Sequence, residues 1–233
     1  KIIFSTDGKL VVCANFRDES DSHGRGFFAH VYSTETPPEL GLKKEFDVQE
    51  NEAWAPPHSQ IQLVANSHRV MIFLGGRGRL LDLESGEPVL DLELGTRSRL
   101  SPDGRFIASR GQRPPITIYC DGKATYEGFP LHGVPTGFSH DSRYLLTQAG
   151  GPSSPRVDIF EGQSGEWLAS YFPRRGLSAE RKFAFNPSST RLAISERDSN
   201  RLNIVDVGTG RELIHLPHEE PLAGFGFHPD RNR

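Results

Sequence analysis

The sequence contains few sulfur-bearing side chains, no excess of basic charge and no long hydrophobic run. Only two of its 233 residues are cysteine and only one is methionine. Lysine and arginine total 27 against 30 aspartates and glutamates, which gives a formal net charge of −3. This balance disfavours nucleic acid as a partner, because no global basic field concentrates phosphates. A bilayer span needs roughly 18 consecutive apolar residues, so we expect no membrane partner either.

Catalytic signatures are also missing. The sequence has no G-x-S-x-G elbow, no H-E-x-x-H metal motif and no G-x-x-x-x-G-K phosphate loop. Nine histidines could suggest a metal site, but only His215 and His218 lie close together in the sequence, and no third ligand accompanies them. We therefore predict no catalytic residue, no cofactor and no metal.

Helical patterning is absent as well. No segment shows a period of about 3.6 residues over ten or more positions. Instead, 24 glycines and 17 prolines punctuate the chain throughout. Because these residues interrupt helices and favour turns, the sequence predicts an all-β fold.

What the sequence does contain is a repeat, in which an apolar residue precedes a Ser-x-Asp-Gly-like turn and a β-rich run. The apolar residue lies at Phe4, Val64, Leu100, Phe138, Phe185 and Phe227, at intervals of 60, 36, 38, 47 and 42 residues. In the turn at residues 101–104, Pro102 fixes φ, Asp103 can accept local backbone hydrogen bonds and Gly104 tolerates a positive φ. Repeats of roughly 40 to 45 residues with four strands each are typical of propeller blades.

A second tight turn follows the third strand of each unit. It reads Asp206-Val207-Gly208-Thr209-Gly210 in the last unit. The closing glycine supplies the left-handed backbone conformation that a short hairpin with a bulge requires. The two turns together predict four antiparallel strands per unit.

Two segments carry a resemblance to a known family. The segment from Ile194 to Asp206 is similar to a WD repeat without gaps, and that from His218 to Asp230 is similar to the family's His-to-turn segment. The resemblance covers nearly the whole chain, most strongly over residues 182–230 and most weakly over residues 1–60. It implies a β-propeller of four-stranded antiparallel blades and a scaffold role toward proteins or peptides.

The chain departs from the family pattern at the usual tryptophan position, before the aspartate. This position holds Tyr32, Leu81, Cys120, Phe160 and Val205. In the family that tryptophan shares a buried hydrogen-bond network with a serine and a histidine, and only His218 fits the histidine here. We therefore expect the blades to depend on aliphatic packing. Cys13 and Cys120 fall in different units, too far apart to form a disulfide.

The repeat also predicts the domain organisation. We expect one propeller domain over residues 1–233, with units at about 1–60, 61–96, 97–134, 135–181 and 182–223 and a partial unit at 224–233. Both ends supply only parts of a unit, so we expect an incomplete ring. The chain begins at Lys1 rather than methionine, and we expect it to be part of a longer protein. The low cysteine content favours a cytoplasmic location, while compartment and oligomeric state stay open.

Loop lengths suggest where a partner could bind. We call the strands of each unit a to d in chain order. The a–b and c–d turns leave from one face of the ring, and the b–c and d–a loops leave from the other. The insertions fall in the b–c and d–a loops, at residues 17–26, 47–60, 110–115, 150–156 and 173–182. Variable loops on a rigid framework commonly carry binding, so this face is predicted to bind the partner.

Several side chains in or beside these loops are candidate contacts. An exposed aromatic flanked by prolines can anchor a partner, and arginines can hold an acidic peptide or a phosphate. The candidates are Trp54, His58, Arg110, Arg113, Arg174, Arg175, Arg181 and Lys182. The alternative for each is ordinary: the tryptophan can pack on a blade edge, and the basic side chains can form a solvated rim.

These observations predict a non-catalytic, WD-repeat-like propeller that binds a protein or peptide. The alternatives are a propeller enzyme of the quinoprotein or lactonase kind, the gating propeller of a hydrolase, or a sensor domain of a larger signalling protein. An enzyme would bring acidic, His or Arg side chains together in the central channel, beside a metal or cofactor.

Overall fold

We describe the protein from a computed structural model of residues 1–233. The described residues are 2–4, 10–17, 26–33, 42–49, 60–64, 67, 69–74, 76–83, 85, 87–95, 97–110, 116–120, 123–129, 133–150, 154–173, 183–196, 201–220, 222 and 224–228.

The described residues form five sheets, each of four antiparallel strands. The first sheet contains β1 (Ile2–Phe4), β2 (Leu10–Arg17), β3 (Gly26–Ser33) and β4 (Leu42–Gln49). The second contains β5 (Gln60–Leu63), β6 (Arg69–Leu74), β7 (Arg77–Asp82) and β8 (Pro88–Glu93). The third contains β9 (Arg97–Leu100), β10 (Phe106–Arg110), β11 (Ile116–Cys120) and β12 (Lys123–Phe129). The fourth contains β13 (Val134–Phe138), β14 (Tyr144–Ala149), β15 (Arg156–Glu161) and β16 (Trp167–Tyr171). The fifth contains β17 (Phe183–Phe185), β18 (Arg191–Glu196), β19 (Arg201–Asp206) and β20 (Glu212–Pro217).

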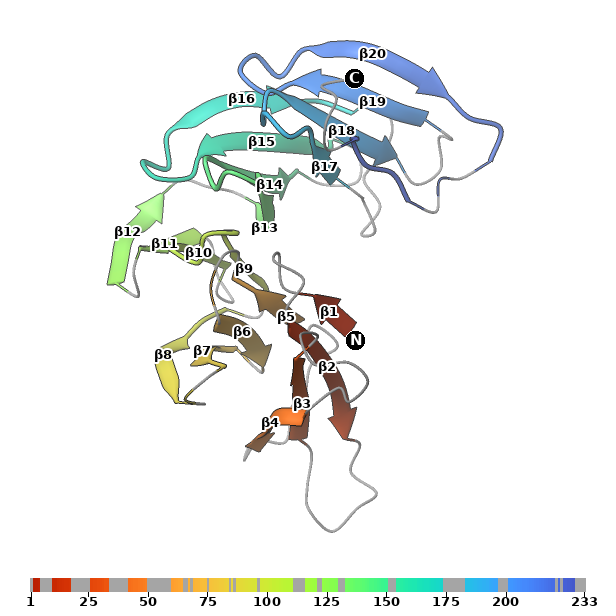
Figure 1. Cartoon of the computed structure of the whole chain (residues 1–233). Coiled ribbons are helices and arrows are strands. Elements are labelled where there is room, and N and C mark those ends of the chain that lie inside the picture. Colours follow the sequence, from red (N-terminus) through yellow and green to blue (C-terminus); the bar gives the residue numbers. More distant parts are fainter. Residues whose placement is uncertain are drawn as a thin grey trace.

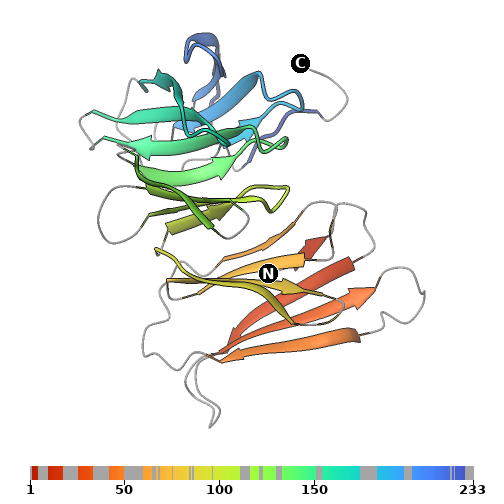
Figure 2. The ribbon, with the colours of Figure 1, turned by 90° about the vertical axis from the view of Figure 1, so that its left-hand side faces the viewer.

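The five sheets follow one another along an arc (Figures 1 and 2). The first sheet lies at the bottom of Figure 1 and the last at the top, with the other three joining them on the left. The strand order within each sheet follows the sequence, and no strand of the fifth sheet pairs with the first among the described residues. The predicted all-β propeller with an incomplete ring is therefore confirmed.

The spacing between the first two strands is the same in every sheet. Five residues separate the a and b strands in each case, at positions 5–9, 64–68, 101–105, 139–143 and 186–190. In the third sheet, Ser101 Oγ donates to Asp103 Oδ1 over 2.6 Å and accepts from Phe106 N over 2.9 Å. Such local hydrogen bonds from serine and aspartate stabilise a tight turn, so the repeated turn chemistry explains the repeated strand register.

One position of this turn is left-handed in three successive sheets. Gly104 has a φ of 76°, Ser142 of 61° and Ser189 of 55°. The turns of the third and fourth sheets are also linked directly, because Asp103 N donates to Ser142 Oγ over 3.1 Å. The turns therefore stabilise their own hairpins and connect neighbouring sheets.

The c–d turns of the fourth and fifth sheets have the predicted glycine and bulge. In the fifth sheet, Asp206 Oδ1 accepts from Thr209 N over 2.9 Å, and Gly210 has a φ of 69°. The register of β19 and β20 shifts between Ile204 and Val205, directly after this turn. Gly165 of the fourth sheet has the same φ of 69°.

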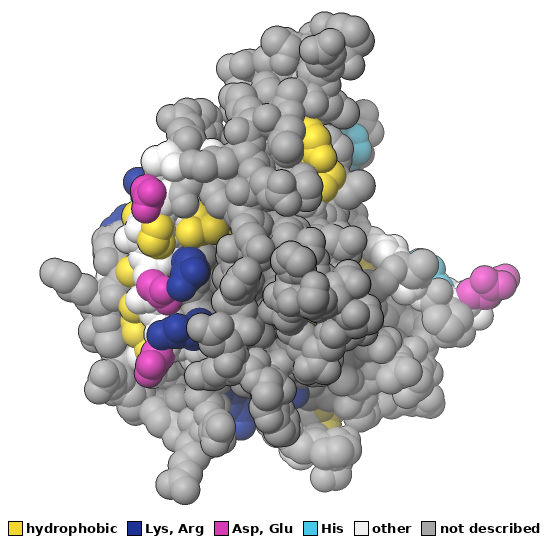
Figure 3. Space-filling model, turned by 90° about the horizontal axis from the view of Figure 1, so that it is seen from below, with side chains coloured by type: hydrophobic (Ala, Val, Ile, Leu, Met, Phe, Trp, Pro, Cys, Tyr) yellow, Lys and Arg dark blue, Asp and Glu magenta, His cyan; other side chains and the backbone are white. Residues whose placement is uncertain are grey.

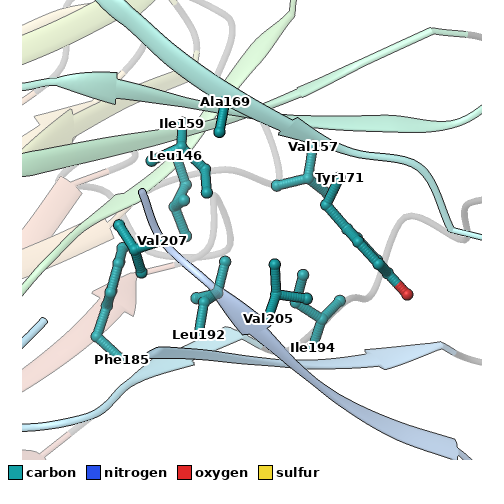
Figure 4. Packing of buried hydrophobic residues seen from close by; sticks show 10 residues of the cluster. All are labelled: Leu146, Val157, Ile159, Ala169, Tyr171, Phe185, Leu192, Ile194, Val205 and Val207. Carbon is teal, nitrogen blue, oxygen red and sulfur yellow. The ribbon is translucent and has the colours of Figure 1, made fainter. Parts of the chain in front are cut away.

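Aliphatic packing joins the sheets, as the sequence predicts. Between the fourth and fifth sheets, side chains such as Leu146, Ile159, Leu192 and Val205 form a buried cluster (Figure 4). The residues at the usual tryptophan position all lie in third strands. Of these, Leu81, Phe160 and Val205 are buried, and Tyr32 and Cys120 are half-buried. Both cysteines are free of disulfides, as expected.

Candidate binding site between the third and fourth sheets

Of the predicted contact residues, only Arg110 lies among the described residues, at the end of β10. The remaining predicted residues, Trp54, His58, Arg113, Arg174, Arg175, Arg181 and Lys182, lie outside the described residues.

Arg110 belongs to a group of arginines on one face of the third sheet. The pairing of β9 with β10 places Arg97 directly opposite Arg110 and Arg99 opposite Ala108. Side chains two residues apart on a strand share a face, so the three arginines lie on the face that carries Ala108. Ala108 packs in a cluster with Phe160 of the fourth sheet. The arginines therefore lie on the side of the third sheet that faces the fourth.

Arg99 connects the two sheets. Its Nε donates to the carbonyl oxygen of Thr136 in β13 over 2.9 Å. Burial lowers the pKa of Arg99, and the positive charge of Arg97 lowers it further. Arg97 is exposed and Arg110 is half-buried. Arg97 and Arg110, together with the hydrogen-bonded Arg99, make this face of the third sheet locally positive, although the net charge of the chain is −3.

The fourth sheet contributes a further arginine from the opposite side. Arg156 Nε lies 2.8 and 2.9 Å from the two carboxylate oxygens of Asp158. Asp158 is only 2% exposed, whereas the Arg156 side chain is 39% exposed. Asp158 binds Arg156 through Nε, and among the described residues no hydrogen bond involves the two terminal nitrogens of Arg156. Asp158 is two residues from Phe160, so this ion pair lies on the face of β15 that looks toward the third sheet.

An open groove of about 620 Å³ extends from this ion pair along the outer strand β16. It is lined by Arg156, Asp158, Phe160, Gly165, Trp167, Leu168, Ala169, Ser170, Phe172 and Thr209. Trp167 and Phe172 are 57% and 63% exposed, although large aromatic side chains are normally well buried. The groove therefore offers two aromatic rings to solvent beside a charged pair.

Hydrogen bonds fix the orientation of the Trp167 indole. Its Nε1 donates to Ser170 Oγ over 3.2 Å, and Ser170 Oγ in turn donates to Asp158 Oδ1. The indole N–H is thus already satisfied within the protein. Trp167 can therefore contact a ligand through the apolar face of its ring, and Arg156 would form the new polar contacts.

The arginines and Phe172 lie at one end of their strands. Arg97 begins β9, Arg110 ends β10 and Arg156 begins β15, while Phe172 follows the end of β16. These are the ends from which the b–c and d–a loops leave. Arg156, Trp167 and Phe172 were not identified as candidates from the sequence. The only sequence signal for the aromatic pair is that both residues flank an outer strand.

The described residues contain no group of three or more His, Cys, Asp or Glu side chains that could hold a metal ion. Within the same residues, no helix is long and apolar enough to cross a membrane.

Comparison with solved structures supports the fold. The chain is similar to the β-propeller domain of Cps50 (Swd1) from Myceliophteria thermophila, with a TM-score of 0.64 and 15% identity. The alignment covers 99% of this chain and 77% of that domain. This is a β-propeller fold. No protein-family model and no curated protein matches the chain, so its similarity to WD repeats rests on the sequence motifs described above.

Proposed function

We propose that this chain is a non-catalytic, WD-repeat-like propeller scaffold that binds an extended acidic peptide of a protein partner. The peptide would start at the boundary between the third and fourth sheets, on the face of the b–c and d–a loops, and run along the outer strand β16 to Trp167. The observation that carries the proposal is that Arg97, Arg110 and Arg156 lie at the same end of their strands, on the facing sides of the third and fourth sheets, and that Arg156 also lines the aromatic groove.

The chemistry of the site selects the ligand. Four arginines, Arg99 among them, lie on the facing sides of the third and fourth sheets. Arginine forms strong, charge-assisted hydrogen bonds with carboxylates, which favours aspartate or glutamate in the peptide. Beyond Arg156, the exposed rings of Trp167 and Phe172 favour proline or another apolar side chain, because interfaces concentrate energy in such aromatic anchors.

The neighbouring loops extend the same charge pattern in the sequence. The b–c loop after β10 contains Arg113, and the d–a loop after β16 contains Arg174, Arg175, Arg181 and Lys182. We propose these basic residues, together with Trp54 and His58 of the loop after β4, as further contacts on the same face. We also propose that residues 1–233 form a single domain with the units given above, and that the partner is neither nucleic acid nor membrane.

The proposal is tested by selecting peptides from a phage-displayed random library with the purified protein. We expect enrichment of peptides that combine Asp or Glu with aromatic residues or proline. A synthetic copy of the most enriched peptide then serves as the probe in fluorescence anisotropy. Trp167→Ala should weaken its binding about 30-fold, the usual loss of about 2 kcal/mol for an anchor residue. Arg97→Gln combined with Arg110→Gln should weaken binding and reduce its salt dependence.

Two matched controls locate the effect. Val89→Ala removes an apolar side chain of the second sheet that is 47% exposed, and Arg143→Gln removes an exposed arginine from an a–b turn on the opposite face. Both variants should bind like the wild type. A variant in which residues 50–59 are replaced by a short Gly-Ser turn tests the contribution of the loop after β4. Enrichment of basic peptides, or of peptides with no excess of Asp and Glu, would refute the proposed ligand chemistry.

A further inference from the structure

The outer strand β20 of the fifth sheet exposes more large hydrophobic side chains than the outer strands β8 and β16. Among the described residues, six large hydrophobic side chains are exposed, and three of these lie on β20. Leu213, Ile214 and Leu216 are 47%, 46% and 41% exposed. No described strand pairs with the outer side of β20. The backbone N–H and C=O groups on that side can therefore accept a further strand.

Proteins usually protect such edges with charged side chains. The outer strand β8 has this protection, because Asp91 and Glu93 alternate with its apolar residues and Asp91 pairs with Arg79 over 2.7 Å. Figure 3 shows acidic, basic and hydrophobic side chains mixed in this way along one flank of the molecule. Within β20, carboxylate charge is confined to Glu212 at the start, His215 is the one polar residue in the middle, and Pro217 ends the strand.

We propose that β20 pairs with β20 of a second copy, so that two fifth sheets join into one eight-stranded antiparallel sheet. The charges that flank the strand favour this occupant. Arg211 precedes the strand, while Glu219 and Glu220 follow it. Antiparallel pairing of two copies brings the basic end of each strand to the acidic end of the other.

The register follows from antiparallel geometry. In an antiparallel pair, two directly opposite residues either both direct their N–H and C=O groups toward the partner strand or both direct them away. This direction alternates along each strand, so a residue cannot lie opposite its own neighbour in the second copy. The two-fold axis must therefore pass at the level of one residue, which lies opposite its own copy. An axis at His215 places Ile214 opposite Leu216 of the second copy. The same register places Arg211 opposite Glu219. By symmetry, this register forms the Ile214–Leu216 contact twice and the Arg211–Glu219 ion pair twice. The two copies then use the same surface, as a two-fold dimer requires.

The inference is independent of the peptide site, which involves the third and fourth sheets. A pair of six-residue strands buries less surface than a standard interface, so we expect reversible dimers with a dissociation constant of about 10 to 100 μM. Sedimentation velocity of the full chain over about 1 to 300 μM should show a concentration-dependent shift from monomer to dimer at constant buffer composition. A chain that stays monomeric over this range overturns the proposal.

Substitutions test the surface. Ile214→Lys and Leu216→Lys each place a charge on the edge and should abolish dimerisation. Val89→Lys makes the same change at an equally exposed position of β8 and should leave dimerisation intact. Circular dichroism melting confirms that each variant is folded. Dimerisation that survives both changes on β20 overturns the proposal, since association would then use another surface.

Charge reversal tests the register. Arg211→Glu alone and Glu219→Arg alone should each weaken self-association at least tenfold, because each homodimer then holds two like-charge pairs. An equimolar mixture of the two variants should restore association at the wild-type level, since the mixed dimer contains two opposite-charge pairs. Addition of about 1 M salt should remove this difference. A mixture that associates no better than its separate components overturns the proposed register.

Discussion

Replacement of Gly210 by alanine should destabilise the contact between the fourth and fifth sheets. Gly210 has a φ of +69°, and a Cβ at this position would lie 2.5 Å from the carbonyl oxygen of Ser170 and 2.9 Å from its carbonyl carbon. The left-handed conformation costs a non-glycine residue about 1 to 2 kcal/mol. Overpacking against backbone atoms costs about 1 to 3 kcal/mol more, because the strand β16 must move as a unit.

Alanine also lowers the conformational entropy of the unfolded chain, which offsets about 0.4 to 1 kcal/mol of this destabilisation. We therefore expect Gly210→Ala to lower the free energy of unfolding by about 2 to 4 kcal/mol. For a chain of this size the melting temperature should fall by roughly 5 to 12 °C. Urea denaturation followed by circular dichroism and differential scanning calorimetry measure the two quantities independently.

Gly208→Ala in the same turn is the matched control. A Cβ at Gly208 meets only Asp206 Oδ1, at an ordinary contact distance of 3.6 Å, and its φ is not left-handed. Its unfolding free energy should stay within about 1 kcal/mol of the wild type. Equal stability of the two variants would refute the argument that the close approach to Ser170 restricts position 210 to glycine.

Two further predictions concern carboxylates. Burial opposes ionisation of Asp141, but hydrogen bonds from Ser139 Oγ and Arg143 N outweigh it, so the pKa of Asp141 is lowered. Its stabilising effect is therefore present above the unfolded-state pKa of about 3.9 and is lost as the pH falls through the lower folded-state value. Asp141→Asn should be less stable than the wild type at pH 7, by about 1 kcal/mol, and the difference should shrink in urea titrations as the pH is lowered below about 3.9. Asp158→Ala should lower the free energy of unfolding by about 2 kcal/mol, because Ser170 and the partly exposed Arg156 lose their buried acceptor. In a double-mutant cycle, the additional change Arg156→Met should recover part of this loss. Strictly additive losses would show that the two side chains are not coupled.

The fold follows from local sequence to a large extent. The a–b turns are specified by neighbouring residues such as Ser101 and Asp103, whose hydrogen bonds lie within five positions of each other. Such short-range chemistry is visible in the sequence, and its recurrence predicts the number of sheets. The aliphatic residues at the usual tryptophan position were likewise predicted to pack, and Leu81, Phe160 and Val205 are buried.

The candidate site follows from the sequence only in part. The sequence places both Arg97 and Arg110 near loops, but their direct opposition across β9 and β10 follows only from the strand register set by the five-residue turn 101–105. Exposure of Trp167 and Phe172 depends on how much of β16 an adjacent sheet leaves uncovered. That property arises from the packing of units distant in the sequence, so no local pattern predicts it.

The open arc has a thermodynamic consequence. Along the arc in Figure 1, the second, third and fourth described sheets each lie between two others, whereas the first and fifth described sheets lie at its ends. In such a linear array, the total stability is the sum of the stability of each sheet and of each interface between neighbouring sheets. Local unfolding of an end sheet therefore breaks one interface, whereas unfolding of an interior sheet breaks two. Amide protons of β14 and β15 should then exchange with solvent more slowly than those of β18 and β19, although all four strands lie inside their sheets.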